Sequence, residues 1–552
     1  MYSSIGGSMY AEIIEPSCAT VPGPLLRHSI TIALHAFSPW LPSSEKILAA
    51  EKYVTELDFY GEFRQRSNAK FLNCAAHELP MSRSTQKTKF SRILLVNPWI
   101  YDFSAFDLWI KPLGLLYVGG YLRQHGYDVH LIDCLDRHNP QLLRLQGRTG
   151  PQLKAYGTGK FFRRVIKTPE VLRQFPYPYR CYGLPEEIFC GMLAHRPRPD
   201  AILVTSMMTY WYPAVFRAIE LLKQHFPHVP IILGGVYPSL CPGHAVCHSG
   251  ADYVIPGQAT DRLITLLDQL TGQIRKKSLS RLNIDHITPA YDLYEHLDYA
   301  GILSSLGCPF RCSYCASQRL CPNFVQREPE AVLSTIQDLF EQRSVRNFAF
   351  YDDALLVNFH AHLQPILEQL IQRNVSCCFH TPNGLHAKYI NDESAELLFQ
   401  AGFKTLRISL ETIDPTRQKE TGGKVTNNEF EHAVRALQKA GFQGDQIGVY
   451  LFIGLPGQQY EETEATIRYV HNLGLLVNLC EFSPIPGTRE WTRLERAGSI
   501  SANDDPLLHN NSIFLYLRQR YGFEQVQSLR NLIRALNATI RSRTETTQAI
   551  AE

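Results

Sequence analysis

The sequence predicts an α/β protein in which an open, doubly wound, Rossmann-like parallel sheet precedes a partial (β/α)6 TIM-type barrel. Two runs of short apolar strands alternate with amphipathic helices, the first from Arg92 and the second from about residue 296. A dense cysteine motif directly follows the first strand of the second run. With 552 residues, of which 45% are hydrophobic and 19% charged, the chain is long enough to form several globular domains.

Charge balance and hydropathy argue against two classes of partner. The 55 Lys and Arg residues exceed the 52 Asp and Glu residues by only three, too few for the dense phosphate contacts of a nucleic-acid-binding protein. No segment approaches the roughly 20 uninterrupted apolar residues that span a bilayer, so we expect no membrane partner. The first residues, MYSSIGGSMYAEIIEP, lack a basic stretch followed by an apolar one, so we expect no secretory signal and a cytoplasmic location.

The first two predicted parts of the chain are an extension and a sheet domain. Residues 1–88 form an N-terminal extension whose prolines interrupt every candidate helix until SSEKILAAEKYVTEL. Residues 89–290 form the doubly wound domain, with strands RILLVNP, YDVHLIDC, DAILVTS and VPIILGG and helices over PLGLLYVGGYLRQHG and AVFRAIELLKQHF. Ligands of such sheets bind at the carboxyl ends of the strands, which here carry Asn97, Ser206 and Gly234.

Residues 291–500 form the predicted barrel, and residues 501–552 form a C-terminal helical segment that packs against it or covers it. The barrel strands are AGILSSL, NFAFYD, SCCFHT, TLRISLE, IGVYLFIG and LVNLCEFSP, and helices such as EPEAVLSTIQDLFEQ and DESAELLFQAG lie between them. Such an incomplete barrel has its active site at the C-terminal ends of the strands. The cysteine motif lies at this end.

Cys308, Cys312 and Cys315 form a CxxxCxxC motif within GCPFRCSYCA. With 14 cysteines in the chain, chance would give roughly 0.01 such triplets, so the spacing indicates a metal site. Three thiolates can hold a cluster and leave one metal position without a protein ligand, whereas a structural zinc site uses four ligands. Cys321 lies six residues later and could complete a zinc site, so structural zinc and a structural iron–sulfur cluster both stay alternatives.

The GTGK string at residues 157–160 does not predict nucleotide binding. A P-loop needs a glycine five residues before the second glycine of this string and Ser or Thr after the lysine. Lys154 and Phe161 occupy those positions, so we interpret the string as a basic surface turn.

With Tyr314 just before its third cysteine, the motif resembles that of the radical S-adenosylmethionine (SAM) superfamily. The resemblance implies that Cys308, Cys312 and Cys315 hold a 4Fe-4S cluster whose remaining iron is chelated by the amino and carboxylate groups of SAM. One electron passed into the sulfonium then releases methionine and a 5′-deoxyadenosyl radical. In such enzymes the cofactors carry the difficult chemistry, and the protein supplies orientation and excludes water.

Later segments resemble the SAM-binding segments of the same superfamily. FYDDALL resembles the segment that contacts the methionine moiety, which implies that Asp352 or Asp353 lies near its ammonium group. RISLET resembles the ribose segment, with Ser409 and Glu411 as candidate partners of the hydroxyls. FIGLPGQ, which contains Ile453, and FSPIPGT resemble the backbone segments around the adenine. Each of these last two segments alone is also typical of an ordinary turn rich in Gly and Pro.

The upstream domain resembles the cobalamin-binding domain that precedes the barrel in a large subgroup of this superfamily. The matching stretches are PLGLLYVGGYLRQHGYDVHLIDC, IILGGVYPSLCPGHAV and GADYVIPGQAT. The resemblance implies a cobalamin at the strand ends, in contact with Asn97, Ser206, Gly234, Gly235 and Gly257.

Two features depart from that subgroup. Its usual GEGE-like turn reads GQAT here, at residues 257–260, and the DxHxxG motif that supplies a histidine to cobalt in other cobalamin proteins is absent. The nearest string, DRHNPQ, has Asp136 and His138 but Gln141 in place of the glycine. We therefore interpret His138 as a solvent-side loop residue and expect cobalamin to be held without a protein imidazole.

The resemblance implies a cobalamin-dependent radical SAM enzyme that methylates an unactivated carbon of a small-molecule or natural-product substrate. Its electron would come from an external donor such as a flavodoxin or a ferredoxin. One alternative has the same cofactors but performs a cyclisation, an oxidation or a rearrangement. Another is a non-catalytic protein that only binds cobalamin or an iron–sulfur cluster, which the altered GQAT turn slightly favours.

Overall fold

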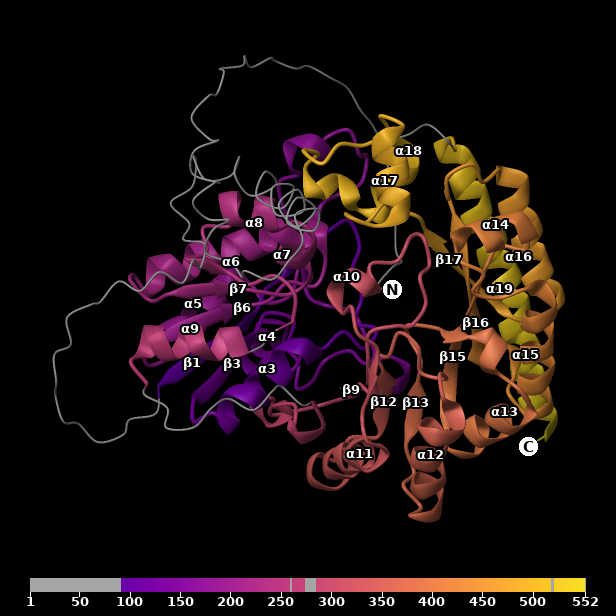
Figure 1. Ribbon diagram of the computed structural model, residues 1–552, viewed down its shortest axis with the longest axis horizontal. Helices are drawn as coiled ribbons and strands as arrows, with labels where there is room; N and C mark the ends of the chain where they lie inside the picture. The colour runs from indigo at the N-terminus through magenta and orange to yellow at the C-terminus, as the bar shows by residue number, and fades with distance from the viewer. Residues whose placement is uncertain (1–90, 259–260, 274–283, 518–520, 552) are drawn as a thin grey trace, which may run out of the picture. The chain divides into compact units, whose positions relative to one another are not determined.

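The structure is a computed structural model that describes residues 91–258, 261–273, 284–517 and 521–551 (Figure 1). The expected N-terminal extension, residues 1–88, lies outside the described residues. In the part of the chain that is described, no helix is long and apolar enough to cross a bilayer.

The first domain contains a five-stranded parallel sheet in the order β3-β1-β6-β7-β8. The chain passes from β1 to β3 on one side and then to β6 on the other, so the strand order reverses between β1 and β6. This reversal confirms the doubly wound fold and opens a ligand crevice at the carboxyl ends of the strands. The strands are β1 (Arg92–Asn97), β3 (Asp128–Asp133), β6 (Ala201–Val204), β7 (Ile231–Leu233) and β8 (Tyr253–Val254).

Helices cover both faces of this sheet, which explains why its strands are apolar along nearly their whole length. On one face lie α3 (Leu113–Gln124) and α9 (Asp261–Thr271), and on the other α5 (Glu186–Ala194) and α6 (Tyr212–His225) (Figure 1). The shorter helices are α4 (Pro140–Leu145), α7 (Val236–Leu240) and α8 (Pro242–His248). A small antiparallel sheet lies beside them, formed by β2 (Ile100–Asp102), β5 (Arg180–Tyr182) and β4 (Arg163–Val165).

The second domain is a partial barrel of six parallel strands in the order β17-β16-β15-β13-β12-β9, as the sequence predicts. The strands are β9 (Ala300–Ile302), β12 (Asn347–Phe350), β13 (Cys378–His380), β15 (Phe403–Glu411), β16 (Ile447–Ile453) and β17 (Leu476–Glu481). The short strand β14 (Leu385–His386) also pairs with β15, and β10 (Ser305–Leu306) pairs with β11 (Val325–Gln326) outside the barrel.

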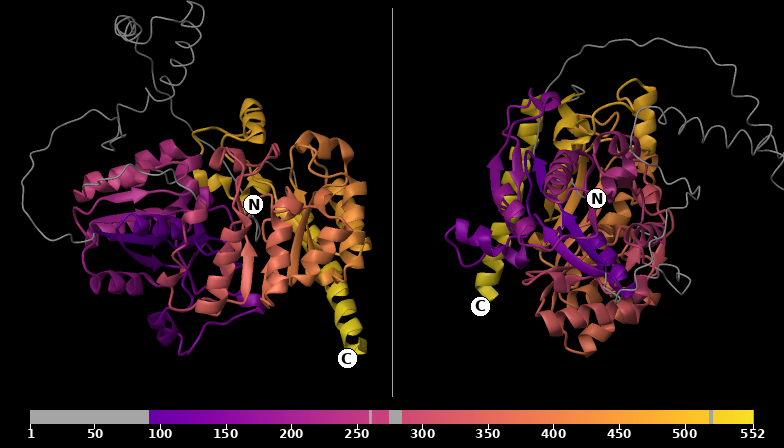
Figure 2. Two further views of the ribbon diagram at one scale, coloured as in Figure 1. Left: turned by 60° about the horizontal axis from the view of Figure 1, so that its bottom comes forward. Right: turned by 90° about the vertical axis from the view of Figure 1, so that its left-hand side faces the viewer.

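An outer layer of helices surrounds the barrel strands (Figures 1 and 2). Two of these helices begin with capping boxes, built by Asn391 with Ser394 and by Thr426 with Glu429, so their first turns are fixed locally. The helices are α11 (Pro329–Arg343), α12 (Leu363–Gln372), α13 (Asp392–Gln400), α14 (Pro415–Thr421), α15 (Asn427–Lys439) and α16 (Tyr460–Asn472). A further helix, α17 (Arg489–Arg496), lies apart from this layer and packs against Tyr314 of the cysteine motif (Figure 1).

The C-terminal segment is helical, with α18 (Asn511–Leu517) and α19 (Phe523–Ala551). The amide side chain of Asn537 on α19 bonds both the N–H and the C=O of Val477, each at 2.9 Å, so α19 satisfies backbone groups of the last barrel strand. Of the two expected roles, packing against the barrel or covering it, α19 therefore has the first, because it packs against the barrel.

One apolar core extends from the α3 face of the first sheet into the barrel. It is reinforced by polar links, such as the Tyr294 hydroxyl that donates to Asp133 at 2.6 Å. The domain boundary at residue 290 stays a prediction, as do those at 88 and 500.

Two expectations about exposure are wrong. His138 is not a solvent-side residue, because its side chain is only 18% exposed and its Nε2 lies 2.9 Å from Asp298. In the GTGK string only Lys160 is exposed, since Gly157, Thr158 and Gly159 are buried. The Arg137 guanidinium explains their burial, because it donates to the carbonyls of Gly157 and Thr158.

Candidate functional site

The three motif cysteines lie on a segment that contacts the C-terminal end of the neighbouring helix α14. The backbone N–H of Ser313 donates to the carbonyl of Thr421 at 2.9 Å. Gly422 has a φ of +127°, and a Cβ there would lie only 3.1 Å from Cys312 Cα. The backbone can approach this closely because Gly422 has no side chain.

The cysteine side chains are buried or half-buried, and two of them pack against an apolar cluster. Burial raises the pKa of the Cys308 thiol to about 12, and burial raises that of Cys312 to about 11 although the Lys424 ammonium opposes the shift. Such thiols become thiolates when a metal replaces the proton. Three soft sulfur donors on one short segment suit an iron–sulfur cluster.

Among the described side chains, no three His, Cys, Asp or Glu residues are close enough together to hold one metal ion. A 4Fe-4S cluster does not need that arrangement, because each of its thiolates binds a different iron. Cys321, the candidate fourth zinc ligand, lies at the end of α10 (Ser317–Leu320), and its sulfur accepts from the amide of Gln258 at 2.9 Å.

Glu411 ends β15 in a buried network that involves the cysteine segment. It is 4% exposed and has a φ of +72°, an uncommon conformation for a residue with a side chain. Its carboxylate accepts from the Tyr314 hydroxyl and lies 3.3 Å from Lys424 Nζ. Lys424 is itself buried, which lowers its pKa, but the Glu411 carboxylate and the neighbouring Cys312 and Cys315 sulfurs together outweigh this effect and leave the pKa raised.

The two aspartates that follow β12 have different partners. Asp353 lines the large cavity described below and accepts from the Ser317 hydroxyl at 2.7 Å, and that hydroxyl lies 3.2 Å from Cys315 Sγ. Asp352 is 3% exposed and accepts from the backbone N–H of Ser304 and from the hydroxyls of Ser304 and Ser305. Asp352 thus ties β12 to the turn after β9, and Asp353 is the one directed toward the cysteine segment.

Ser409 and Ile453 are fully buried at the ends of β15 and β16. The Ser409 hydroxyl has no hydrogen-bond partner among the described residues, and a Cβ at Gly384 would lie 3.0 Å from it. The Oδ1 atom of Asn383, the residue before Gly384, is also buried and has no hydrogen-bond partner within the described chain. Buried polar atoms of this kind usually have a partner, which here a ligand could supply.

The carboxyl ends of β6 and β7 approach each other closely. Gly235 has a φ of +97°, and a Cβ there would overlap the Ser206 backbone at 2.4 Å. Gly234 is different, because a Cβ there would meet nothing closer than the Ile255 carbonyl at 3.8 Å. Gly257 has a φ of +79° and donates its N–H to Ser239 Oγ at 2.8 Å. These residues form a backbone-lined crevice that a large planar ligand could approach.

Asn97 lies outside this crevice. Its side chain donates to Asp133 Oδ1 at 2.7 Å, and the two residues are register partners on β1 and β3. Asn97 lines neither of the two larger cavities. The structure thus gives it a partner within the sheet, and we leave it out of the proposed cobalamin site.

A cavity of about 520 Å³ connects the two halves of the site. The first domain contributes the β6 end, residues 205–210, together with Gly235 and Gly257, and the barrel contributes Tyr314 and Cys315. A second cavity of about 270 Å³ extends along Gly234, Gly235 and Gly257 toward α9. The predicted site residues that line one or both cavities are Ser206, Gly234, Gly235, Gly257, Tyr314, Cys315 and Asp353. Those that do not are Asn97, Cys308, Cys312, Asp352, Ser409, Glu411 and Ile453.

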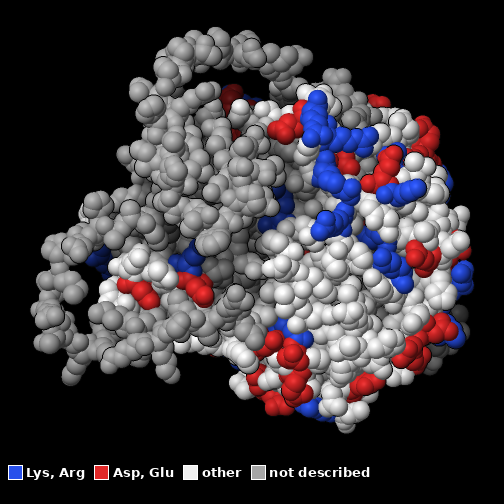
Figure 3. All heavy atoms as spheres, viewed as in Figure 1, with Lys and Arg blue, Asp and Glu red and all other residues white. Residues whose placement is uncertain are grey.

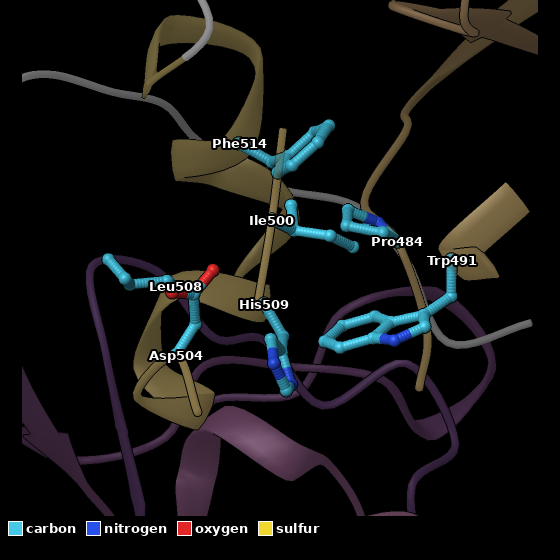
Figure 4. A pocket seen from close by; sticks show the side chains of 7 residues that line it. All are labelled: Pro484, Trp491, Ile500, Asp504, Leu508, His509 and Phe514. Carbon is cyan, nitrogen blue, oxygen red and sulfur yellow. The ribbon is translucent and has the colours of Figure 1, made fainter. Parts of the chain in front are cut away.

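His509 is a site residue that the sequence does not suggest. It lies before α18 and lines both the 520 Å³ cavity and a small adjoining space of about 20 Å³. Figure 4 shows its ring next to the Trp491 indole, and the two rings meet edge to face with centroids 5.1 Å apart. Neither ring nitrogen has a partner among the described residues, and burial lowers the pKa of His509 to about 4. A neutral imidazole in the cavity wall can donate to or accept from a ligand.

Family models match both halves of the site. Residues 302–470 match the model of the Radical SAM superfamily, and residues 191–267 match the B12 binding domain. The first match runs from the end of β9 to α16, and the second contains β6, β7 and β8.

Individual relatives are distant. The chain is 22% identical over 324 residues to an uncharacterised methyltransferase of Pyrococcus horikoshii, covering 53% of this chain and 69% of the relative. It is 24% identical over 298 residues to the hopanoid C-2 methylase of Rhodopseudomonas palustris, and this match covers 51% of this chain and 55% of the relative. The chain therefore spans about half the length of that relative.

The fold is similar to that of the radical SAM methyltransferase TsrM from Kitasatospora setae, solved with cobalamin and a 4Fe-4S cluster. The TM-score is 0.54 at 16% identity, over 74% of this chain and 75% of that one. Sheet topology, cysteine motif and both family matches therefore agree that this chain contains a Radical SAM domain and, upstream of it, a B12-binding domain.

Proposed function

We propose that the chain is a cobalamin-dependent radical SAM enzyme that transfers a methyl group to an unactivated carbon of a small molecule. The observation that carries this proposal is the 520 Å³ cavity, because its wall joins the strand ends of the Rossmann-like sheet to the cysteine segment. A substrate between the two halves could be reached from both sides, which two-cofactor chemistry at one carbon requires.

In this proposal each half of the site has a defined task. Cys308, Cys312 and Cys315 hold the 4Fe-4S cluster, and Asp353 accepts a hydrogen bond from the amino group of SAM. Glu411 and Ser409 lie at the strand end proposed for the ribose. The crevice of Ser206, Gly234, Gly235 and Gly257 holds cobalamin, for which these glycines leave the backbone free. When bound, these cofactors supply hydrogen abstraction and methyl transfer.

The cavity wall is suited to a substrate with few charges. Leu303, Phe452 and Phe482 contribute apolar surface, and His509 and Asn383 contribute buried polar atoms with no partner in the described structure. An apolar wall with a few directed polar groups excludes water and still orients a ligand. We infer a small molecule that is largely apolar and presents at least one hydrogen-bonding group.

The electron for SAM cleavage comes, in our proposal, from an external flavodoxin or ferredoxin. We place the chain in the cytoplasm, where the three thiols stay reduced and available to the cluster.

Comparison of metabolites from a strain lacking the gene with those of its parent, grown without oxygen, tests the methyl transfer. We expect the deletion strain to accumulate a compound that is one CH2 lighter than the missing product. A missing product with the same carbon count as the accumulated compound, but cyclised, oxidised or rearranged, would contradict methyl transfer and support the alternative chemistry with the same cofactors.

A further inference from the structure

The helix α17 contacts the cysteine segment directly. Its buried side chains Trp491 and Leu494 belong to the apolar cluster that contains Tyr314 and against which Cys312 and Cys315 pack. The N–H of Glu490 donates to the carbonyl of Ser313 at 3.1 Å. One face of this short helix therefore lies on the proposed cluster loop.

The opposite face of α17 is basic. Arg489, Arg493 and Arg496 have the i, i+4, i+7 spacing that places side chains on one side of a helix, and all three are exposed. The Arg493 side chain is 58% exposed, and its ion pair to Glu490 is long, at 3.8 Å. Of the two acidic residues of the helix, Glu490 is buried and Glu495 lies off the basic face.

The basic surface continues over the cysteine segment itself. Arg311 is exposed one residue before Cys312, and its carbonyl accepts from the Arg489 guanidinium at 2.7 Å. Arg319 is exposed, and its guanidinium lies over Gly487, so close that a Cβ there would meet it at 2.4 Å. Figure 3 shows Lys and Arg side chains gathered in a band over α17 and the neighbouring part of the barrel. We call Arg311, Arg319, Arg489, Arg493 and Arg496 the arginine patch.

We propose that the arginine patch is the docking surface for an acidic one-electron carrier protein of the flavodoxin type, an inference that rests on the proposed function. At the contact the carrier is oxidised by one electron and the cluster is reduced by one, and no bond or proton is exchanged. A helix with its side chains is about 10 Å across, so a carrier on the outer face of α17 lies roughly that distance from the thiols.

Two observations favour this partner over an anionic substrate or a nucleic acid. No residue of the arginine patch lines the 520 Å³ cavity, so a substrate in that cavity would not meet these charges. The net charge of the chain is only +3, so the patch is a local feature and not part of a generally basic surface. Transient redox partners bind through small interfaces, for which charge complementarity sets the association rate.

The test uses the full-length holoenzyme and compares Arg493→Glu/Arg496→Glu with the control Arg534→Glu/Arg541→Glu on α19, which makes the same charge change at exposed positions. The rate of 5′-deoxyadenosine formation from SAM is measured with reduced flavodoxin and, separately, with dithionite. Binding of oxidised flavodoxin and the iron content are measured in parallel. The milder variant Arg493→Gln/Arg496→Gln keeps the comparison valid if the double reversal folds poorly.

We expect the patch variant to lose roughly tenfold in flavodoxin-supported rate and to bind flavodoxin more weakly, because electrostatic steering raises association rates by 10-fold or more. Its dithionite-supported rate and iron content should match the wild type, and added salt should slow only proteins with an intact patch. An unchanged flavodoxin rate, an equal loss in the control, or a parallel loss with dithionite would overturn the proposal. If the wild type does not cleave SAM even with dithionite, the proposed function fails, and the binding measurement still tests the surface.

Discussion

Lys424 and Glu411 form a buried ion pair beside the cysteine segment, and replacement of Lys424 by Met should destabilise the barrel. The Lys424 Nζ and Glu411 Oε1 atoms are 3.3 Å apart, and the two side chains are 6% and 5% exposed. Two unit charges at that distance attract by about 5 kcal/mol at an effective dielectric constant of 20. Removal of one partner leaves the other charge buried and typically costs about 3–5 kcal/mol.

Urea denaturation at neutral pH, followed by the transition midpoint, measures this loss, and amide hydrogen exchange of β15 and α14 locates it. We expect Lys424→Met to unfold at clearly lower urea, while the exposed control Lys419→Met behaves like the wild type. The double variant Lys424→Met/Glu411→Gln should recover most of the loss, because no unpaired charge remains and Tyr314 can still donate to the amide oxygen. Wild-type stability of the single variant, or no recovery in the double variant, would refute the reasoning.

Three further predictions concern the cofactors and pH. We expect about four iron atoms per chain in the wild type; Cys312→Ala should lose this iron, whereas Cys321→Ala should keep it. Elemental analysis measures both metals, and a wild type that carries zinc which both variants lose would contradict the cluster. Gly234→Ala should keep wild-type thermal stability, because the structure has room for a Cβ at this position. The variant should nevertheless retain less cobalamin, which the corrin absorbance after desalting measures, and undiminished retention would remove this residue from the proposed site. Burial raises the pKa of Asp102 to about 6, although Trp211 and Asn510 donate to its carboxylate, so this group destabilises the fold as pH rises from about 4 to 6. The contribution is about 3 kcal/mol, and Asp102→Asn should flatten the decline in urea midpoint over this window; identical pH profiles would contradict it.

The sequence predicts the elements of both domains because their patterns are local. The predicted apolar strands β1, β3, β6 and β7 are all present, and both main sheets are parallel as expected. Gly235 is predicted only as a cobalamin contact, and the structure adds a separate reason for glycine there, its φ of +97° and its close approach to the Ser206 backbone. The cysteine motif is equally local, with all three residues within eight positions.

Pairings between distant positions are not visible in the sequence. Tyr314 meets Glu411 across 97 positions, and His509 reaches the cavity from beyond the last barrel strand. Asp352 and Asp353 are neighbours that point to different surroundings, so the motif alone cannot decide which one faces a ligand. Asn97 has the right place at a strand end but bonds its register partner Asp133, and only the structure reveals that contact.

The central claim is that Cys308, Cys312 and Cys315 support SAM cleavage in the cavity that the two domains share. Its most direct test is to incubate anaerobically reconstituted protein with SAM and dithionite and to quantify 5′-deoxyadenosine, with Cys312→Ala as the control. We predict that 5′-deoxyadenosine forms with the wild type and is absent from the variant. Protein that carries a complete 4Fe-4S cluster but forms no 5′-deoxyadenosine, or forms it equally without Cys312, would contradict the account.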